Sequence, residues 1–306
     1  MTKTDSKSLA TSALLVCINC SRWGYRKVED ELASKTAKDV HADDGMFHTT
    51  KRLIAKEAVK DLDSTYSQFK SHFYVNTLPW DDSGYRLLPA ANYLDFAESA
   101  RKLREEALAQ VDKFLKLYPT LRDNAQKKLG DAFRESDYPS TASLRYRYGV
   151  EIHFKPIPDK ADIRIDVPAA ELKRISADID GEVRRALERA TTDMFERLYH
   201  VVLAMRDRLK EYKVVTKGKK QVREHSFRDS IVTNIKELCE LLPKLNVTQN
   251  AELDRLVAEV SKSLGGQEPE QLRDNDDLRK EAIKKADSLL AKMEEYIGAD
   301  VKAMEV

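Results

Sequence analysis

The clearest hydrophobic pattern in the chain is a stripe that runs through residues 171–212. Its apolar members recur every three or four positions: Leu172, Ile175, Ile179, Val183, Ala186, Ala190, Met194, Leu198, Val201, Met205, Leu209 and Tyr212. The mean spacing is about 3.6 residues, which is the period of a straight α-helix rather than of a left-handed heptad coil. We therefore expect one helix about 60 Å long. Other helices have to lie along it to cover the stripe.

Weaker stripes of the same period predict further helices before and after it. Residues 90–130 form the second long helical region, in which Pro119 should cause a kink or begin a new helix. An earlier helix should begin at Thr49 or Thr50 and continue to about residue 69. Helices are also expected at 227–242, where Pro243 should stop the helix, and at 250–264. A highly charged segment with a thin apolar stripe, 268–297, follows Gly265 and Gly266.

The period changes from 3.6 to 2 within residues 148–167. Apolar residues alternate with charged or polar ones in 149–155 and again in 162–167, which predicts a β-hairpin with one apolar face. An isolated two-stranded hairpin is marginally stable in water, so a third strand is needed. The short apolar run 14–19 is the best candidate. Residues 78–89 contain two prolines and a glycine and are expected to form a packed loop.

These patterns predict a mainly α protein with a small β-sheet, of class α+β. We expect an elongated antiparallel bundle of long, coiled-coil-like helices with the β-hairpin at its root. Residues 1–12 should be a flexible N-terminus, 13–264 the helical body with its sheet, and 265–306 a hinge and a charged C-terminal helix. Any uncovered helical length is free to pair with a second copy, so a homo-oligomer stays an open alternative.

Composition and charge narrow the classes of function. Charged residues make up 34% of the chain, which suits long solvated helices. The net charge is only +1, so a general attraction to nucleic acid or to an acidic membrane is not expected. Three cysteines do not make a disulfide framework, which favours a reducing compartment. Because the sequence shows no signal peptide and no membrane span, we expect a cytoplasmic protein.

Candidate catalytic chemistry is sparse. The common motifs for nucleotide binding, zinc proteases and hydrolases do not occur, so we predict no catalytic residue and no cofactor. Cys17 and Cys20 resemble half of a zinc site, but Cys239 is too far along the chain to complete it, and we expect packed thiols. A metal-dependent enzyme that uses Asp162, Asp166 and His153 is the third hypothesis, against an ordinary solvated sheet face.

Basic residues crowd the segment after the long helix. They form a candidate phosphate-contacting tip for nucleic acid, against the simpler interpretation of a solvated turn: Lys213, Lys217, Lys219, Lys220 and Arg223. Arg22, Arg26 and Lys27 offer a second basic patch. Nucleic-acid binding is therefore the alternative function.

Two loops combine aromatic and basic residues, which is typical of the centres of protein–protein interfaces. The candidate partner-binding residues are Trp23 and Tyr25 in the first loop and Trp80, Tyr85 and Arg86 in the second. In the simpler interpretation, these rings cover the sheet edge or helix ends. With the long amphipathic helices, they make a non-enzymatic interaction or adaptor protein our leading prediction.

A series of short sequence motifs extends this prediction. They are Trp23-Gly24, Leu78-Pro79-Trp80 followed by Gly84-Tyr85-Arg86, Asp137-Tyr138-Pro139, Phe154-Lys155-Pro156-Ile157-Pro158 followed by 162–167, and Phe227-Arg228-Asp229-Ser230. In this order, across about residues 13–260, they resemble an uncharacterised, mainly helical family of phages and mobile elements. Its genes are often found near a MoxR-type AAA ATPase and a von Willebrand factor A protein. The resemblance implies one of these as a protein partner and a bacterial host cytoplasm, and it supplies no catalytic residue.

Overall fold

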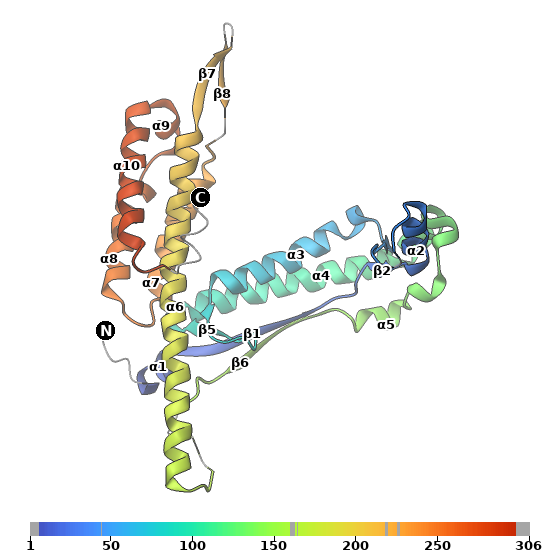
Figure 1. The fold of residues 1–306 in the computed structure, drawn as a ribbon, viewed down its shortest axis with the longest axis horizontal. Coiled ribbons are helices and arrows are strands. Elements are labelled where there is room, and N and C mark those ends of the chain that lie inside the picture. Colours follow the sequence, from blue (N-terminus) through green and yellow to red (C-terminus); the bar gives the residue numbers. More distant parts are fainter. Residues whose placement is uncertain are drawn as a thin grey trace. The chain divides into compact units, whose positions relative to one another are not determined.

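The structure is a computed structural model that describes residues 6–43, 45–159, 163, 165–217, 220–224 and 227–297, with the backbone alone at 6–8, 213–217 and 220–224. The described chain is mostly helical, with a small four-stranded sheet and a separate hairpin, so the predicted α+β class is confirmed. It forms two compact units (Figure 1). Unit 1 comprises Met1–Cys17, Val75–Leu94 and Phe154–Val306, and unit 2 comprises Ile18–Tyr74 and Asp95–His153.

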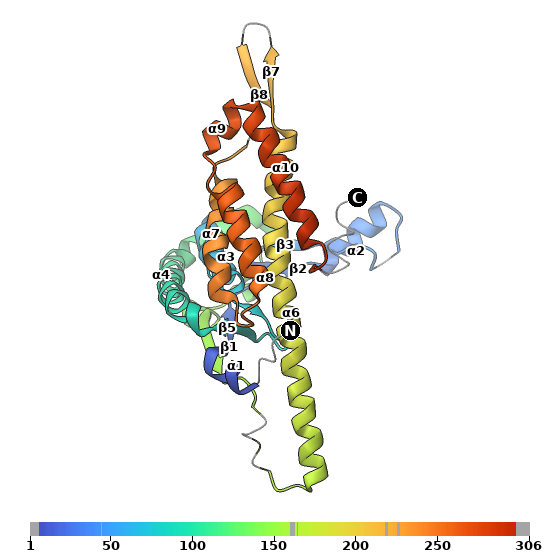
Figure 2. The same cartoon turned by 90° about the vertical axis from the view of Figure 1, so that its left-hand side faces the viewer.

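Unit 1 is built on the predicted long helix, α6 (Ala169–Glu211). Its apolar stripe is buried from Val183 onward except at Val201, which is partly buried, whereas Leu172 is 37% exposed. Helix α10 (Asp276–Met293) and helices α7 (Ser230–Leu245) and α8 (Ala251–Val260) contact α6. Figures 1 and 2 show these three helices beside the C-terminal part of α6. The C-terminal charged helix is therefore part of the core of unit 1.

The remaining boundaries in unit 1 differ in detail from those predicted. The turn η4 (Ser261–Gly265) continues α8 as a π-helical turn, and α9 (Pro269–Asp274) precedes α10. Pro243 lies inside the last turn of α7, so the predicted stop there was wrong by a few residues. Helix α1 (Ser6–Ser12) forms in the segment that we expected to be flexible, and its Leu9 is buried.

The four-stranded sheet has the strand order β4-β5-β1-β6. Strands β1 (Ala13–Ser21) and β6 (Gly149–Lys155) confirm two of the three predicted strands. Strands β4 (Leu78–Pro79) and β5 (Arg86–Pro89) lie in the segment that we predicted to be a loop. Strand β5 pairs with β1 in antiparallel register, and its Leu87 and Leu88 are fully buried. Burial of these two leucines explains why the segment pairs as a strand.

The predicted strand 162–167 was wrong in its described part. Ile163 and residues 165–167 adopt no strand, and Ile165 is 55% exposed. Ile163 and Val167 are only partly buried, so the alternating pattern places no fully buried apolar face here, and burial is what fixes strand register. Asp162 and Arg164 lie outside the described residues. The predicted β-hairpin at the root of α6 therefore does not form in the described residues. Strand β6 neighbours β1 in the four-stranded sheet instead.

Unit 2 contains α2 (Asp30–Asp39) and most of α3 (Lys56–Val75) and α4 (Ala90–Leu129). Helix α4 includes Pro119 as an internal residue, so no new helix begins there. Strands β2 (Arg26–Val28) and β3 (Thr50–Arg52) form a small antiparallel ribbon. Thr50 lies in β3 and α3 begins later, so the predicted cap at Thr49 or Thr50 was wrong. Short helices η1 (Gly130–Ala132), η2 (Glu135–Asp137) and α5 (Thr141–Arg145) complete the unit.

An ionic cluster joins these short elements of unit 2, and we call it the lysine cluster. The Lys51 ammonium lies 2.5 Å from a Glu29 carboxylate oxygen and 2.7 Å from one of Asp137, and it donates to the Ala132 carbonyl at 2.8 Å. Lys27 adds a second cation 2.6 Å from Asp137. The side chains of Lys51, Glu29 and Asp137 are at most 7% exposed. The three donors of the ammonium are therefore matched by three acceptors.

Removal of the buried cation should destabilise unit 2. In a Lys51→Met variant, Glu29 and Asp137 would keep buried charges with fewer partners, which costs about 3–5 kcal/mol in comparable pairs. Urea unfolding should register this loss. The control is Lys56→Met at the exposed first residue of α3, which should change the free energy of unfolding by less than about 0.5 kcal/mol. Equal stability of the two variants would contradict the structural role of the cluster.

The same cluster predicts a dependence on pH. Burial alone would raise the pKa of Asp137, but hydrogen bonds from Lys27 and Lys51 outweigh it and hold this pKa below the ordinary 3.8. A carboxyl group with a lowered pKa in the folded chain stabilises the fold above its unfolded pKa, and this contribution is lost as the pH falls through the folded pKa. The stability advantage of the wild type over Asp137→Asn should therefore be constant above about pH 5 and shrink as the pH falls from about 5 to about 2 in urea unfolding. An advantage that is constant over this range would contradict the assignment.

Candidate functional site

The basic segment after α6 forms a two-stranded antiparallel ribbon, the basic hairpin, rather than the turn that we expected. Strand β7 (Lys213–Lys217) pairs with β8 (Lys220–Glu224), and Lys217 stands opposite Lys220 in the register. Of the predicted nucleic-acid-binding residues, Lys213 and Lys217 belong to β7, Lys220 and Arg223 belong to β8, and Lys219 lies outside the described residues. The sequence signal that we missed is that strand-forming valines lie on both sides of a two-residue connection. Val214 and Val215 precede it, and Val222 follows it.

Like charges that stand directly opposite each other in an antiparallel pair are destabilising. The backbone register brings Lys217 and Lys220 into this arrangement, whereas Lys213 stands opposite Glu224. The register of the basic hairpin therefore pairs two residues of like charge, and an anion bound there would relieve their repulsion.

The first predicted partner-binding loop belongs to an aromatic core in unit 2. Trp23 is only 5% exposed and makes edge-to-face contacts with Tyr25 and Tyr118, at ring-centroid distances of 5.6 and 5.7 Å. The hydroxyl of Tyr148 donates to that of Tyr25 at 3.4 Å, and burial is the main cause of the raised pKa of Tyr25. These contacts give Trp23 and Tyr25 a packing role in unit 2.

One buried hydroxyl in the same unit has no hydrogen-bond partner in the described structure. It belongs to Tyr66, which is 2% exposed, and burial raises its pKa to about 12. Burial also raises the pKa of the half-buried Cys20 thiol. A thiol with a raised pKa is a weak nucleophile, so this corner of unit 2 does not have the features of a reactive cysteine site.

The second predicted partner-binding loop is held to α6 within unit 1. Trp80 is 1% exposed, and its carbonyl accepts a hydrogen bond from Arg189. Arg197 donates to the carbonyls of Val75 and Thr77 at 2.7 and 2.8 Å. The segment before β4 is thus anchored to α6 through its backbone.

Arg86 and Tyr85 from this loop are partly buried. Arg86 donates to the hydroxyl and the carbonyl of Thr77 at 2.8 and 3.0 Å. The Lys155 ammonium lies 4.1 Å from the centre of the Tyr85 ring, which is a cation–π contact. Both side chains therefore already have partners within unit 1, as the simpler packing interpretation of this loop requires.

The residues of the metal hypothesis are not brought together in the described structure. No group of three or more described His, Cys, Asp or Glu residues could hold a metal ion. His153 contacts Glu151 at 3.3 Å, Asp166 is exposed, and Asp162 is not among the described residues. Cys17 and Cys20 are half-buried free thiols and Cys239 is buried, as expected for packed cysteines. Among the described helices, none combines the length and apolar character that a membrane crossing requires.

Exposed apolar side chains that the sequence analysis did not single out lie in β2, in α2 and in the segment after α2, and we call them together the apolar surface. Its large side chains are between 38% and 77% exposed: Val28, Leu32, Val40, Met46 and Phe47. Helix α2 buries only Ala33 and Ala37. His41 has a φ of +57°, a left-handed conformation that costs a non-glycine residue about 1 kcal/mol. This conformation ends α2 as a left-handed helix cap, in which the Ala42 N–H donates to the Ala37 carbonyl at 2.9 Å, so the candidate binding surface rests on the exposed apolar groups.

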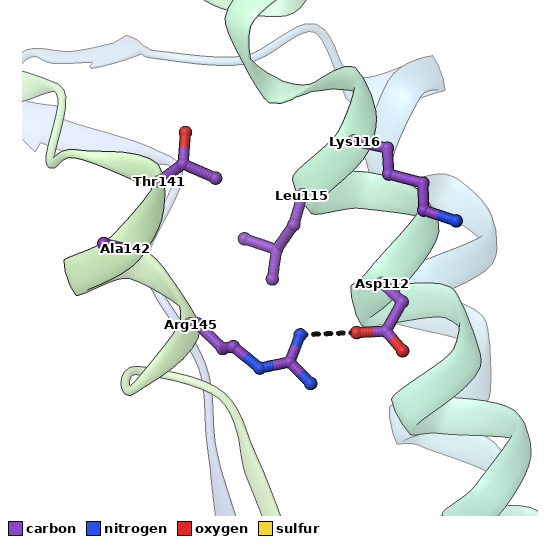
Figure 3. A pocket seen from close by; sticks show the side chains of 6 residues that line it. All are labelled: Asp112, Leu115, Lys116, Thr141, Ala142 and Arg145. Carbon is purple, nitrogen blue, oxygen red and sulfur yellow. Dashed lines mark hydrogen bonds and ion pairs between the residues drawn. The ribbon is translucent and has the colours of Figure 1, made fainter.

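A second surface feature of unit 2 is a hollow of about 370 Å³ between α4 and α5 (Figure 3). Leu115 of α4 points into the hollow, and the Arg145 guanidinium reaches across from α5 to the Asp112 carboxylate at 2.6 Å. Thr141, Ala142 and Lys116 complete the lining. The hollow therefore has an apolar floor and a charged rim.

Comparisons with known proteins add no family and no relative to this geometry. No protein-family model matches the chain, and searches of curated proteins and of solved structures found no significant match.

Proposed function

We propose that the protein is a non-enzymatic interaction protein, an adaptor, that docks a protein partner on the apolar surface of unit 2. The observation that supports this proposal is the exposure of five large apolar side chains within residues 28–47. Burial of one such side chain on binding contributes about 1 kcal/mol or more. Met46, at 77% exposed, adds a flexible and polarizable contact of the kind that adaptable interfaces use.

The identity of the partner is a proposal that rests on the family resemblance. The sequence motifs described above suggest a MoxR-type AAA ATPase or a von Willebrand factor A protein from the same mobile element. The lysine cluster supports the geometry of such docking, because Lys51 in β3 binds Glu29 at the start of α2 and holds this surface on unit 2. A docking surface gains affinity when its backbone is already ordered.

Co-purification with these two candidate partners tests the adaptor proposal. The wild-type chain should co-elute with one of them on gel filtration and should change the ATPase rate if the partner is the ATPase. The triple variant Leu32→Ser, Val40→Ser and Phe47→Ser should weaken this binding at least about tenfold, because apolar contacts at the centre of the interface are lost. The control is Leu117→Ser in α4, which is 56% exposed elsewhere on unit 2 and should bind normally. Absence of co-elution, together with an unchanged ATPase rate, would contradict the proposal.

The basic hairpin supports a second candidate function, which is nucleic-acid binding. A two-stranded β-ribbon fits the major groove of DNA. The opposed Lys217 and Lys220 would each gain a phosphate contact and lose their mutual repulsion. The ribbon thus has both the shape and the charge that duplex recognition requires.

Salt-dependent binding to a labelled duplex tests this candidate function. Lys217→Ala with Lys220→Ala should weaken binding at low salt and should lower the slope of log K against log salt concentration by about two, one for each lost phosphate contact. The charge-matched control is Lys127→Ala with Lys128→Ala in the last turn of α4, which should bind as the wild type does. No retention of the duplex at low salt, or equal binding by the two double variants, would exclude the hairpin as a DNA contact.

A further inference from the structure

The hollow between α4 and α5 lies next to the most exposed large aromatic side chain of the described residues. Tyr146 is the C-cap residue of α5 and is 90% exposed. It follows Arg145, whose guanidinium crosses the hollow, and precedes Arg147, which is also exposed. We call Arg145, Tyr146, Arg147 and the hollow the tyrosine surface. All of it belongs to unit 2.

Tyr146 has no packing role that explains its ring. The other tyrosines near α5, Tyr138 and Tyr148, are at most 8% exposed and contribute to the core of unit 2. Tyr146 thus provides a solvated, flat π-surface, and the residues on either side of it in the chain, Arg145 and Arg147, are exposed cations. Bases stack on aromatic rings of this kind, and arginines bind the phosphates between them.

We propose that the tyrosine surface binds single-stranded nucleic acid. One base stacks on the Tyr146 ring, and the adjoining phosphate binds Arg147. The neighbouring nucleotide lies over the hollow, where Leu115 provides an apolar floor and Arg145 provides donors for its phosphate. A hollow of about 370 Å³ is within the range of small-ligand sites, so it has room for one base with its sugar.

The ion pair on the rim does not prevent this binding. Arg145 and Asp112 are 64% and 50% exposed, and an exposed ion pair contributes little stability in water. A phosphate can therefore share or replace the Asp112 carboxylate as the acceptor for Arg145. Asp112 still carries a negative charge beside the bound phosphate, so its neutralisation should strengthen binding. An acidic peptide would use the same arginines, but its carboxylates have no face that stacks on Tyr146.

The experiment uses the full chain with Lys217→Ala and Lys220→Ala as the parent, so that the contribution of these two lysines of the basic hairpin is removed. The probe is a fluorescein-labelled fifteen-residue oligothymidylate, and fluorescence anisotropy at low salt measures its affinity. Tyr146→Ala should weaken binding about tenfold, whereas Tyr146→Phe should bind as the parent does, because stacking needs the ring and not the hydroxyl. Asp112→Asn should bind more tightly than the parent. The matched control, Leu117→Ala, removes another exposed side chain of unit 2 and should have no effect.

Three results would overturn the proposal. The first is that the parent does not bind the oligonucleotide, and the second is that Tyr146→Ala binds it as tightly as the parent does. The third is that a labelled oligoglutamate peptide binds as tightly as the oligonucleotide and with the same dependence on Tyr146, which would assign the surface to acidic peptides. Duplex binding by the chain with an intact hairpin is measured separately, so a failure of either nucleic-acid contact is distinguishable from a failure of the other.

Discussion

Burial of the apolar stripe of α6 is the constraint on which the rest of unit 1 depends. A single helix cannot remove this stripe from water, and the hydrophobic gain is realised only where other elements cover it. Helices α7, α8 and α10 contact α6 and supply that cover. The backbone on both sides of β4 is tied to the same helix, by Arg197 before the strand and by Arg189 after it. The long helix therefore organises both the helical layer and the loop that leads into the sheet.

Unit 2 is held together by a different kind of interaction. Its short elements contribute few aliphatic residues, and an aromatic group around Trp23 and the lysine cluster hold them together. Buried charges cost desolvation energy, which close and complete pairing has to offset. Lys51 meets this requirement, because its ammonium has two carboxylates and a carbonyl as acceptors. Such pairing specifies one arrangement of β3, α2 and the segment after α4.

The sequence was sufficient for elements whose pattern is long and periodic. Eleven three- and four-residue steps leave no alternative to a helix at α6, and the apolar runs of β1 and β6 were identified with nearly correct bounds. It was insufficient where distant segments decide the outcome. Strand β5 forms because Leu87 and Leu88 pair with β1, which is distant in the sequence. The local sequence around these two leucines is equally typical of a packed loop. The alternation in 162–167 failed for the converse reason, since none of the described apolar residues there is fully buried.

The candidate sites show the same difference between what a local pattern predicts and what contacts between distant segments decide. Basic residues at 213–223 were visible in the sequence, but the pairing of Lys217 with Lys220 depends on a hairpin register that the sequence analysis did not predict. Trp23 and Trp80 were predicted as contacts because both are aromatic and near basic residues, and that pattern does not separate a core ring from a surface ring. The exposed fraction of each side chain separates core rings from surface rings. Both tryptophans are buried in the core, whereas Tyr146 and the apolar side chains of residues 28–47 are exposed to water.

Local conflict with folding preferences is the physical argument that connects the remaining surfaces. Two opposed lysines in a ribbon, exposed apolar side chains around α2, and a solvated tyrosine next to arginines in the chain each cost free energy or contribute none to the fold. A chain whose other features agree with its structure is expected to break local rules mainly where another molecule compensates for them. The type of conflict then indicates the type of partner. Unbalanced charge calls for an anion, exposed aliphatic groups call for another apolar surface, and an isolated ring beside cations calls for a stacked, negatively charged ligand.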